Sequence, residues 1–354
     1  MNTEWQSFLK EQGAVFNDQN EIESFGHPEV EHFLVKHGPV LADLSQNALI
    51  QVSGEEAFDF LQGQLSNDLK EVSDTQAQLS AYCEPQGKVL ALMTVFKQGE
   101  AFYLSFDGSL REAILKRLTM FKLRAKVDLT DLSDEWVHIG YAGEFADLDL
   151  QRALSTKVKE IYQVEHLTQE GATDIIAIKV PGPYHRYSLF GPIEQMKAAW
   201  EAFCSNCEAI GQKDWNLLNI VSGQPEVKQA TSDQFVAQFL NLDKLDAINF
   251  KKGCFPGQEI IARMHYRGKA TKRMLRLHIS EALSLNAGEE IAFKDSADRN
   301  YKFTIVSAGQ DIYEGTVALA VTSIKPLENV QGDLQTESGA IATIEPMPYD
   351  LADD

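Results

Sequence analysis

The chain has 354 residues, of which 44% are apolar, and its formal net charge is −20. This length exceeds what one hydrophobic core usually supports, so we expect two or three domains. The charge argues against a protein that coats nucleic acid, and no apolar run approaches the ~20 residues of a membrane span. The polar start MNTEWQSFLKEQG lacks the basic and apolar regions of a secretory signal, which predicts a cytoplasmic protein.

The first third of the chain alternates between strand and helix patterns. Residues 48–54, ALIQVSG, alternate like a strand, and apolar residues then recur at helical spacing. The runs QAQLSAYC, VLALMTVF and AFYLSF, separated by turns, predict an antiparallel meander. The segment SLREAILKRLTMFKL has helical spacing with Ser109 as its N-cap, and KVDLTDL returns to strand. We therefore predict an α+β domain over residues 1–130.

Two further modules follow. In residues 131–271 the strand-like runs WVHIGYAG, DIIAIKV and RYSLFG precede a long helix from about Ile193 to Ile210, which predicts a second α+β domain. In residues 272–354 the short runs LRLHI, EEIAF, KFTIVSAG and TVALAVTSI predict a small closing β-barrel or sandwich with an acidic tail.

Four cysteines are few for this length, and they predict free thiols rather than a disulfide framework. Cys204 and Cys207 form the pattern CSNC. No second cysteine or histidine pair nearby completes a set of zinc ligands, and the predicted helix begins well before the pair, unlike a thioredoxin motif. We interpret both as cysteines on a helix face, and we predict no metal site.

Cys254 stands in KKGCFPGQE, residues 251–259, directly before the predicted helix QEIIARMHYRG with Gly268 as its C-cap. The helix N-terminus and the neighbouring Lys251 and Lys252 would stabilise a thiolate and bring the pKa of Cys254 below the free value of about 8.5. A reactive thiol is one interpretation. A small buried apolar residue in a tight loop is the other.

Basic residues cluster around this motif. From Lys251 to Arg276 there are eight Lys and Arg residues against the single acid Glu259, and a weaker island runs from Arg111 to Lys126. Such runs are either solvated faces or anion sites.

Trp215 opens the apolar helical run of DWNLLNIVSGQPEV. A position in the core is the more common fate of a single tryptophan. Stacking on a flat heterocycle is the alternative.

Together these motifs resemble a known family. The run NFKKGCFPGQEIIARMHYRGKATKRM resembles the signature of the YgfZ family, which are folate-binding, tRNA-modifying proteins related to the T-protein, the aminomethyltransferase of the glycine cleavage system. Other similar segments are FLQGQLSNDL (60–69), CEPQGK (83–88), DWNLLNIVSGQPEV (214–227), DQFVAQFLNLDKLDAINFKKGC (233–254) and IEPMPYDL (344–351).

The resemblance implies an α+β, three-domain ring like that of the T-protein, with a central pocket for tetrahydrofolate and a small C-terminal β-barrel. Trp215 matches a tryptophan that contacts folate in the family, and Asn47 stands where the family has another, so one stacking face is replaced by an amide. Cys254 is the signature cysteine, and we assign it and Lys252 as candidate catalytic residues. The supporting motif positions are Gly253, Gly257, Gln258, Glu259, Arg263 and Arg267.

The same resemblance implies a function. T-proteins carry an acidic pair where this chain has Ala91 and Leu92, and without a carboxylate we expect no aminomethyltransferase activity. We expect a folate-binding accessory protein for the assembly or maintenance of iron-sulfur proteins and for tRNA modification, with iron-sulfur proteins and tRNA-modifying enzymes as partners. The alternatives are a folate-dependent one-carbon transferase with Cys254 as nucleophile, and a direct tRNA binder, which the net charge disfavours.

Overall fold

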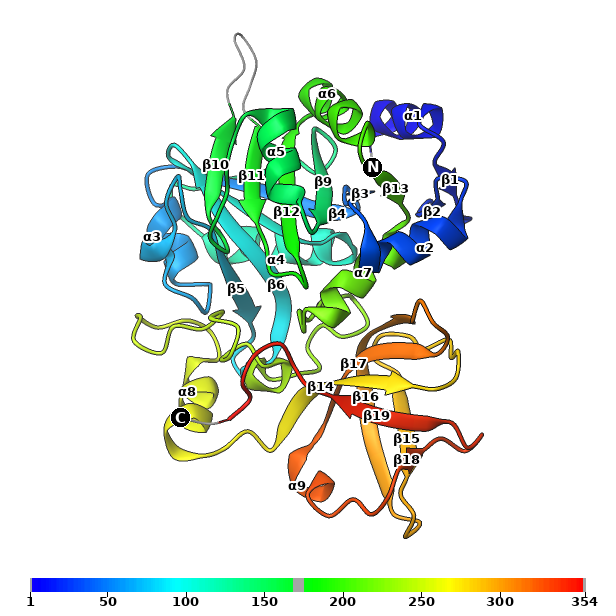
Figure 1. The fold of residues 1–354 in the computed structure, drawn as a ribbon. Helices are drawn as coiled ribbons and strands as arrows, with labels where there is room; N and C mark the ends of the chain where they lie inside the picture. The colour runs from blue at the N-terminus through cyan, green and yellow to red at the C-terminus, as the bar shows by residue number, and fades with distance from the viewer. Residues whose placement is uncertain (1, 168–174, 353–354) are drawn as a thin grey trace. The chain divides into compact units, whose positions relative to one another are not determined.

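The computed structural model describes residues 2–167 and 175–352 (Figure 1). The chain divides into two compact units, each built from separate segments. Unit 1 comprises Met1–Phe60, Lys70–Gln78 and Thr94–Leu218, and unit 2 comprises Leu61–Leu69, Leu79–Met93 and Asn219–Asp354. None of the described helices is long and apolar enough to cross a lipid bilayer.

Unit 1 contains a six-stranded sheet of order β10-β11-β12-β9-β3-β13, in which only the β13–β3 pair is parallel. Its strands are β3 (Val40–Asp43), β9 (Trp136–Gly143), β10 (Val164–Leu167), β11 (Ile175–Lys179), β12 (His185–Pro192) and β13 (Glu208–Ile210). The helices of this part of the chain are α1 (Thr3–Glu11), α2 (Pro28–His37), α5 (Ala146–Leu154), α6 (Ile193–Cys204) and α7 (Gln212–Val221). A short hairpin joins β1 (Val15–Phe16) to β2 (Ile22–Ser24).

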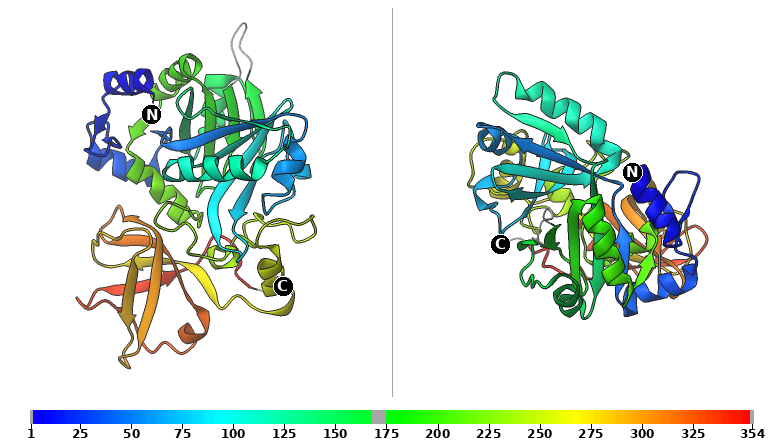
Figure 2. Two further views of the ribbon diagram at one scale, coloured as in Figure 1. Left: turned by 180° about the vertical axis from the view of Figure 1, so that it is seen from behind. Right: turned by 90° about the horizontal axis from the view of Figure 1, so that it is seen from above.

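Apolar residues at helical spacing bury one face of α1 and one face of α6, and the two helices lie side by side (Figures 1 and 2). Trp5 and Trp200 are both fully buried and meet edge to face, with ring centroids 5.8 Å apart. This packing of two large aromatic side chains fixes the helical layer on the sheet.

A second sheet has the order β5-β6-β7-β4-β8. Its strands are β4 (Asn47–Ser53), β5 (Gln78–Cys83), β6 (Val89–Gln98), β7 (Ala101–Asp107) and β8 (Asp128–Asp131), and its helices are α3 (Ala57–Gln62) and α4 (Arg111–Lys122). The three predicted meander strands are therefore neighbours in one sheet, which confirms that prediction.

In unit 2 the C-terminal strands close into a six-stranded barrel of order β14-β17-β16-β15-β18-β19. They are β14 (Lys272–Ile279), β15 (Glu290–Lys294), β16 (Asn300–Gln310), β17 (Thr316–Ser323), β18 (Leu334–Gln335) and β19 (Ile341–Glu345). Alternating apolar residues fill the barrel around Phe293 and Phe303, both fully buried. The remaining helices are α8 (Gln258–Arg267) and α9 (Ile324–Leu327).

Two local predictions are wrong. The predicted long helix ends at Cys204 instead of Ile210, because residues Glu208–Ile210 form β13 and pair with β3. Ser109 is not an N-cap. It lies inside a 3₁₀ turn, and the carboxylate of Asp107 accepts its main-chain N–H at 3.0 Å.

Candidate functional site

Lys252 ties two sequence motifs together within unit 2. Its Nζ donates to the main-chain carbonyls of Gln62 at 2.7 Å, Leu65 at 2.5 Å and Asn67 at 3.0 Å. Burial lowers the pKa of Lys252 to about 8, so the ammonium is still the main form at neutral pH. An ammonium has three N–H bonds, and here three carbonyls accept them. The KGC motif and the LQGQLSN segment are therefore held by one side chain.

Asn249 supports the same loop from the other side. Its Oδ1 accepts hydrogen bonds from the main-chain N–H of Lys251 at 2.8 Å and of Lys252 at 3.0 Å. The main-chain N–H of Asn249 donates to the carbonyl of Ser66 at 3.0 Å. Ser66 Oγ in turn donates to the carbonyl of Ala247 at 2.6 Å. The loop that leads to the signature cysteine is thus anchored before the cysteine is reached.

Two glycines fix the chain after the cysteine. Gly257, the N-cap of α8, has φ +83°, and a Cβ there would lie 2.6 Å from both the carbonyl oxygen of Glu84 and Cα of Gly87. Gly87 also has positive φ and faces the first turn of α8. Only glycine permits this approach without strain. The turn CEPQGK therefore packs directly against the helix start in PGQE.

Cys254 lies between these two anchors, and its side chain is exposed. Gln258 Nε2 is 3.4 Å from the carbonyl of Lys252, which closes the loop across the cysteine. By contrast, a Cβ on Gly253 would meet nothing within 4 Å, so space does not require glycine at that position. The arrangement presents one accessible thiol on a supported loop.

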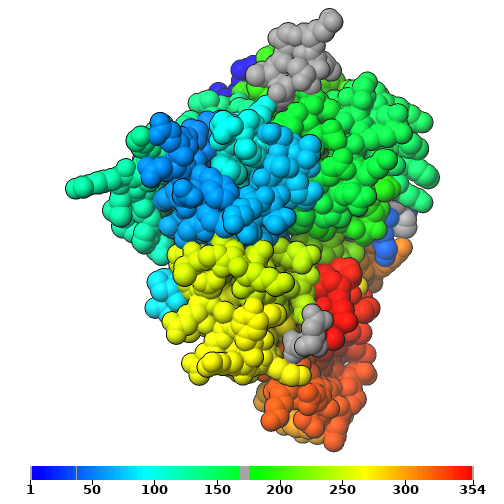
Figure 3. Space-filling view, turned by 90° about the vertical axis from the view of Figure 1, so that its left-hand side faces the viewer, coloured from blue at the N-terminus to red at the C-terminus, as the bar shows by residue number. Residues whose placement is uncertain are grey.

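The exposed motif residues of α8 are Glu259, Arg263 and Arg267, and α8 belongs to the yellow surface in Figure 3. Within the described ranges, no three His, Cys, Asp or Glu side chains come together in a way that could hold a metal ion.

Part of the basic island around Cys254 is internal. Besides Lys252, Arg273 pairs with both carboxylate oxygens of Asp243 at 2.6 and 2.9 Å, and Arg276 pairs with Glu345 at 2.9 Å. Exposed cations remain at Lys251, Arg263, Arg267, Lys269 and Lys272. The run of like charge therefore combines internal ion pairs with a basic surface.

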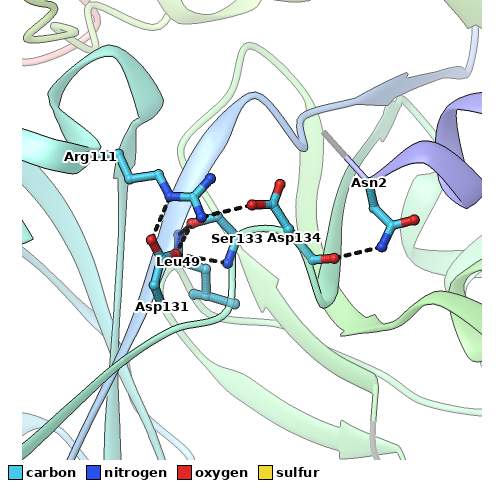
Figure 4. Close-up of polar contacts among 6 residues, drawn as sticks. All are labelled: Asn2, Leu49, Arg111, Asp131, Ser133 and Asp134. Atoms are coloured by element: carbon cyan, nitrogen blue, oxygen red, sulfur yellow. Dashed lines mark hydrogen bonds and ion pairs between the residues drawn. The ribbon is translucent and has the colours of Figure 1, made fainter.

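The second island is partly neutralised in unit 1. Arg111, at the start of α4, contacts Asp131 at 2.5 Å and Asp134 at 2.8 Å, and Ser133 holds the same Asp131 carboxylate (Figure 4). Lys126 pairs with Glu55 at 2.6 Å. These contacts anchor the two ends of the helical segment to its own unit.

Trp215 is 2% exposed and lies in unit 1. The Arg186 guanidinium is 4.5 Å from its ring centroid, which is cation–π geometry. On β9, a Cβ at Gly140 would lie 2.3 Å from the indole ring, so the ring occupies space that only a glycine leaves free. An aromatic face and a cation are thus packed together on the sheet.

Asn47, also in unit 1, faces His138 of β9, with its Nδ2 3.4 Å from His138 Nδ1. His138 is buried and stacks on Phe190 at 4.1 Å. Burial and the charge of Arg186 lower the pKa of His138 to about 3, so the ring is neutral. Since the Asn47 amide donates to Nδ1, we assign the ring proton to Nε2. That nitrogen is buried and has no hydrogen-bond partner among the described residues.

Sequence reasoning missed His138. The available signal was a single imidazole inside the otherwise apolar strand pattern WVHIGYAG, and this signal does not distinguish a buried site from an ordinary strand residue.

Strand β6 reads VLALMTVFKQ and contains no carboxylate. Ala91 is fully buried there and Leu92 half-buried, so apolar side chains occupy the two positions where the resemblance implies an acidic pair in T-proteins.

Comparison with known proteins decides the family. Residues 6–214 match the family described as GCVT N-terminal domain. Proteins named tRNA-modifying protein YgfZ from Escherichia coli O157:H7 and Escherichia fergusonii are 31% and 30% identical to this chain, over 88% of this chain and 93% of each relative. This chain belongs to the YgfZ family.

The fold agrees with that assignment to the YgfZ family. A crystal structure of the glycine cleavage system aminomethyltransferase T from Bartonella henselae matches with a TM-score of 0.80 at 16% identity, covering 98% of this chain and 97% of that chain. The predicted T-protein-like fold with a C-terminal β-barrel is confirmed.

Proposed function

We propose that this protein binds tetrahydrofolate and acts as an accessory protein in tRNA modification and in the maintenance of iron-sulfur proteins. Its relatives carry the name tRNA-modifying protein, and membership of that family supports the role in tRNA modification. The role in iron-sulfur protein maintenance rests on the resemblance of its motifs to the family signature.

The observation that carries folate binding is the buried nitrogen of His138 without a partner. Buried polar groups are nearly always hydrogen-bonded, so an unpaired Nε2–H suits a ligand acceptor. Arg186 lies on β12 of the same sheet, and Trp215 of α7 packs against that sheet at Gly140, so the two residues provide a cation and an aromatic ring. A pterin is flat with polar edges and carries an anionic tail, and these groups fit it. Trp215, Arg186, His138 and Asn47 would hold the folate, which supplies one-carbon chemistry when bound.

The test is calorimetric titration of the full chain with tetrahydrofolate under anaerobic conditions. We expect saturable binding, weakened about tenfold in His138→Gln through loss of one buried hydrogen bond. Trp215→Phe should also weaken it, whereas Trp136→Phe is the matched control and should not. Asn47→Trp should tighten binding by restoring a stacking face. Absence of saturable binding to the wild type would refute the proposal.

A second candidate function is one-carbon transfer with Cys254 as nucleophile, and the exposed thiol on a loop fixed at both ends favours it. The experiment is incubation with methylenetetrahydrofolate labelled in its one-carbon unit. Covalent label on Cys254 that is lost in Cys254→Ser would establish transfer. A protein that binds folate but acquires no label would rule out one-carbon transfer, and the accessory role would then be the remaining function.

A further inference from the structure

Cys204 and Cys207 of unit 1 form a pair that the proposed function does not use. Cys204 is the last residue of α6, and the chain continues in a helical turn, with Ser205 at φ −65° and ψ −20° and the Asn206 N–H donating to Phe203 at 3.0 Å. Residues three apart in such a turn have Cα atoms about 5 Å apart. A disulfide needs roughly 4.4–6.8 Å. The backbone is therefore already arranged for a bond between the two sulfurs.

The environments of the two thiols are not equivalent. The contact with Cys207 lowers the pKa of Cys204, whereas the same contact, burial and the Asp149 charge raise the pKa of Cys207. The thiolate is the nucleophile in exchange reactions. Cys204 is therefore the better candidate for the attacking thiol, and Cys207 for the second thiol, which completes the exchange.

Two adjoining clefts border the turn between the cysteines. The lining of one cleft, of about 260 Å³, includes Ser205, Asn206, Asp149 and Arg152. The other cleft, of about 410 Å³, shares Asn206, Asp149 and Arg152 and adds Glu144. Together they have the size of a small-ligand site. The Arg152 side chain is 72% exposed, and its Nη1 is 3.4 Å from the Asp149 carboxylate, which leaves its other N–H groups for the carboxylate of a ligand. Glu144 can bind an ammonium. The walls suit a zwitterionic peptide.

We propose that Cys204 and Cys207 are a dithiol that exchanges with a small peptide disulfide of the glutathione type bound in these clefts. The Cys204 thiolate attacks one sulfur of the peptide disulfide, forms a mixed disulfide and releases one peptide thiolate. Cys207 then loses its proton to water and attacks the Cys204 sulfur, which releases the second peptide thiolate. The protein loses two hydrogens, and the peptide disulfide is reduced to two thiols.

The test uses the full chain with Cys254→Ser as background, so that the exposed thiol cannot react. The protein is incubated with glutathione disulfide, quenched in acid, alkylated and measured by mass spectrometry. We expect a loss of two hydrogens in the peptide that contains both cysteines, reversed by excess glutathione. Adding Cys207→Ser should trap glutathione on Cys204, and adding Cys204→Ser should make modification of Cys207 much slower. An unchanged mass with Cys204 and Cys207 both present would overturn the proposal.

Arg152→Ala tests the binding clefts separately. Loss of one charge-assisted contact should slow the reaction with glutathione disulfide about tenfold. The uncharged probe bis(2-hydroxyethyl) disulfide should react with wild type and variant at the same rate. If Arg152→Ala leaves the glutathione rate unchanged, or slows both probes equally, the peptide site is refuted.

Discussion

Replacing Lys252 with methionine tests whether its ammonium holds the loop around Cys254. Methionine keeps most of the apolar stem but leaves the carbonyls of Gln62, Leu65 and Asn67 without their donor. Each such hydrogen bond contributes about 1–1.5 kcal/mol net. The cost of burying the ammonium, visible in its lowered pKa, offsets part of the sum. We expect a loss of about 2–3 kcal/mol in the opening free energy of this region.

The assay must report on unit 2. All four tryptophans, Trp5, Trp136, Trp200 and Trp215, lie in unit 1, so their fluorescence does not follow this region. Hydrogen exchange of peptides covering residues 61–69 and 249–257 measures it directly. A loss of 2–3 kcal/mol corresponds to exchange roughly 30- to 150-fold faster in Lys252→Met.

Lys251→Met is the matched control, because Lys251 is the adjacent lysine but is exposed. Its effect should stay within about 0.5 kcal/mol. If residues 61–69 and 249–257 are equally protected from hydrogen exchange in Lys252→Met and Lys251→Met, the reasoning that Lys252 holds these segments together is refuted.

Three further predictions concern acid stability, the α8 turn and thiol reactivity. The unfolding free energy should fall by about 1.4 kcal/mol per pH unit from pH 6.5 toward 3, because only the unfolded chain then protonates His138. The measurement is urea unfolding followed by fluorescence at several pH values from 7 to 5. Over this range the unfolding free energy of His138→Gln should fall less steeply than that of the wild type, and an equally steep fall in both would contradict the prediction. Gly257→Ala should cost about 1–3 kcal/mol by thermal unfolding, whereas Gly253→Ala, in open space, should cost almost nothing. An aromatic disulfide reagent should label Cys254 at once but Cys83, whose pKa burial raises to about 12, only after unfolding, and prompt labelling of Cys83 would contradict its burial.

The sequence was a good guide to features that depend on local periodicity. The alternating runs became β4, β5, β6 and β7, because a period of two residues specifies a half-buried strand wherever it occurs. The end of α6 was predicted too late. A helical pattern continues through Cys207, but pairing of residues 208–210 with β3 overrides it, and that partner lies far away in the chain.

Candidate-site residues were predictable as motifs, whereas their roles were not. Lys252 stands beside Cys254 in sequence, which suggested a direct chemical role, yet its contacts lie 185 to 190 residues away. Charge counting likewise could not separate Arg273, which is buried and paired with Asp243, from the exposed Arg263. Such assignments depend on long-range contacts that a linear pattern does not contain.

The geometry therefore separates two kinds of residue within the one motif. Lys252 and Gly257 are fully engaged with their own unit, the first by three carbonyls and the second by close approach to the turn at Gly87. Cys254 is exposed, and Gly253 has no steric need to be glycine. A reactive group is most effective when rigid neighbours hold it while leaving it accessible. By this argument Lys252 is a positioning residue for Cys254, and the catalytic role assigned to it from the sequence stays a prediction.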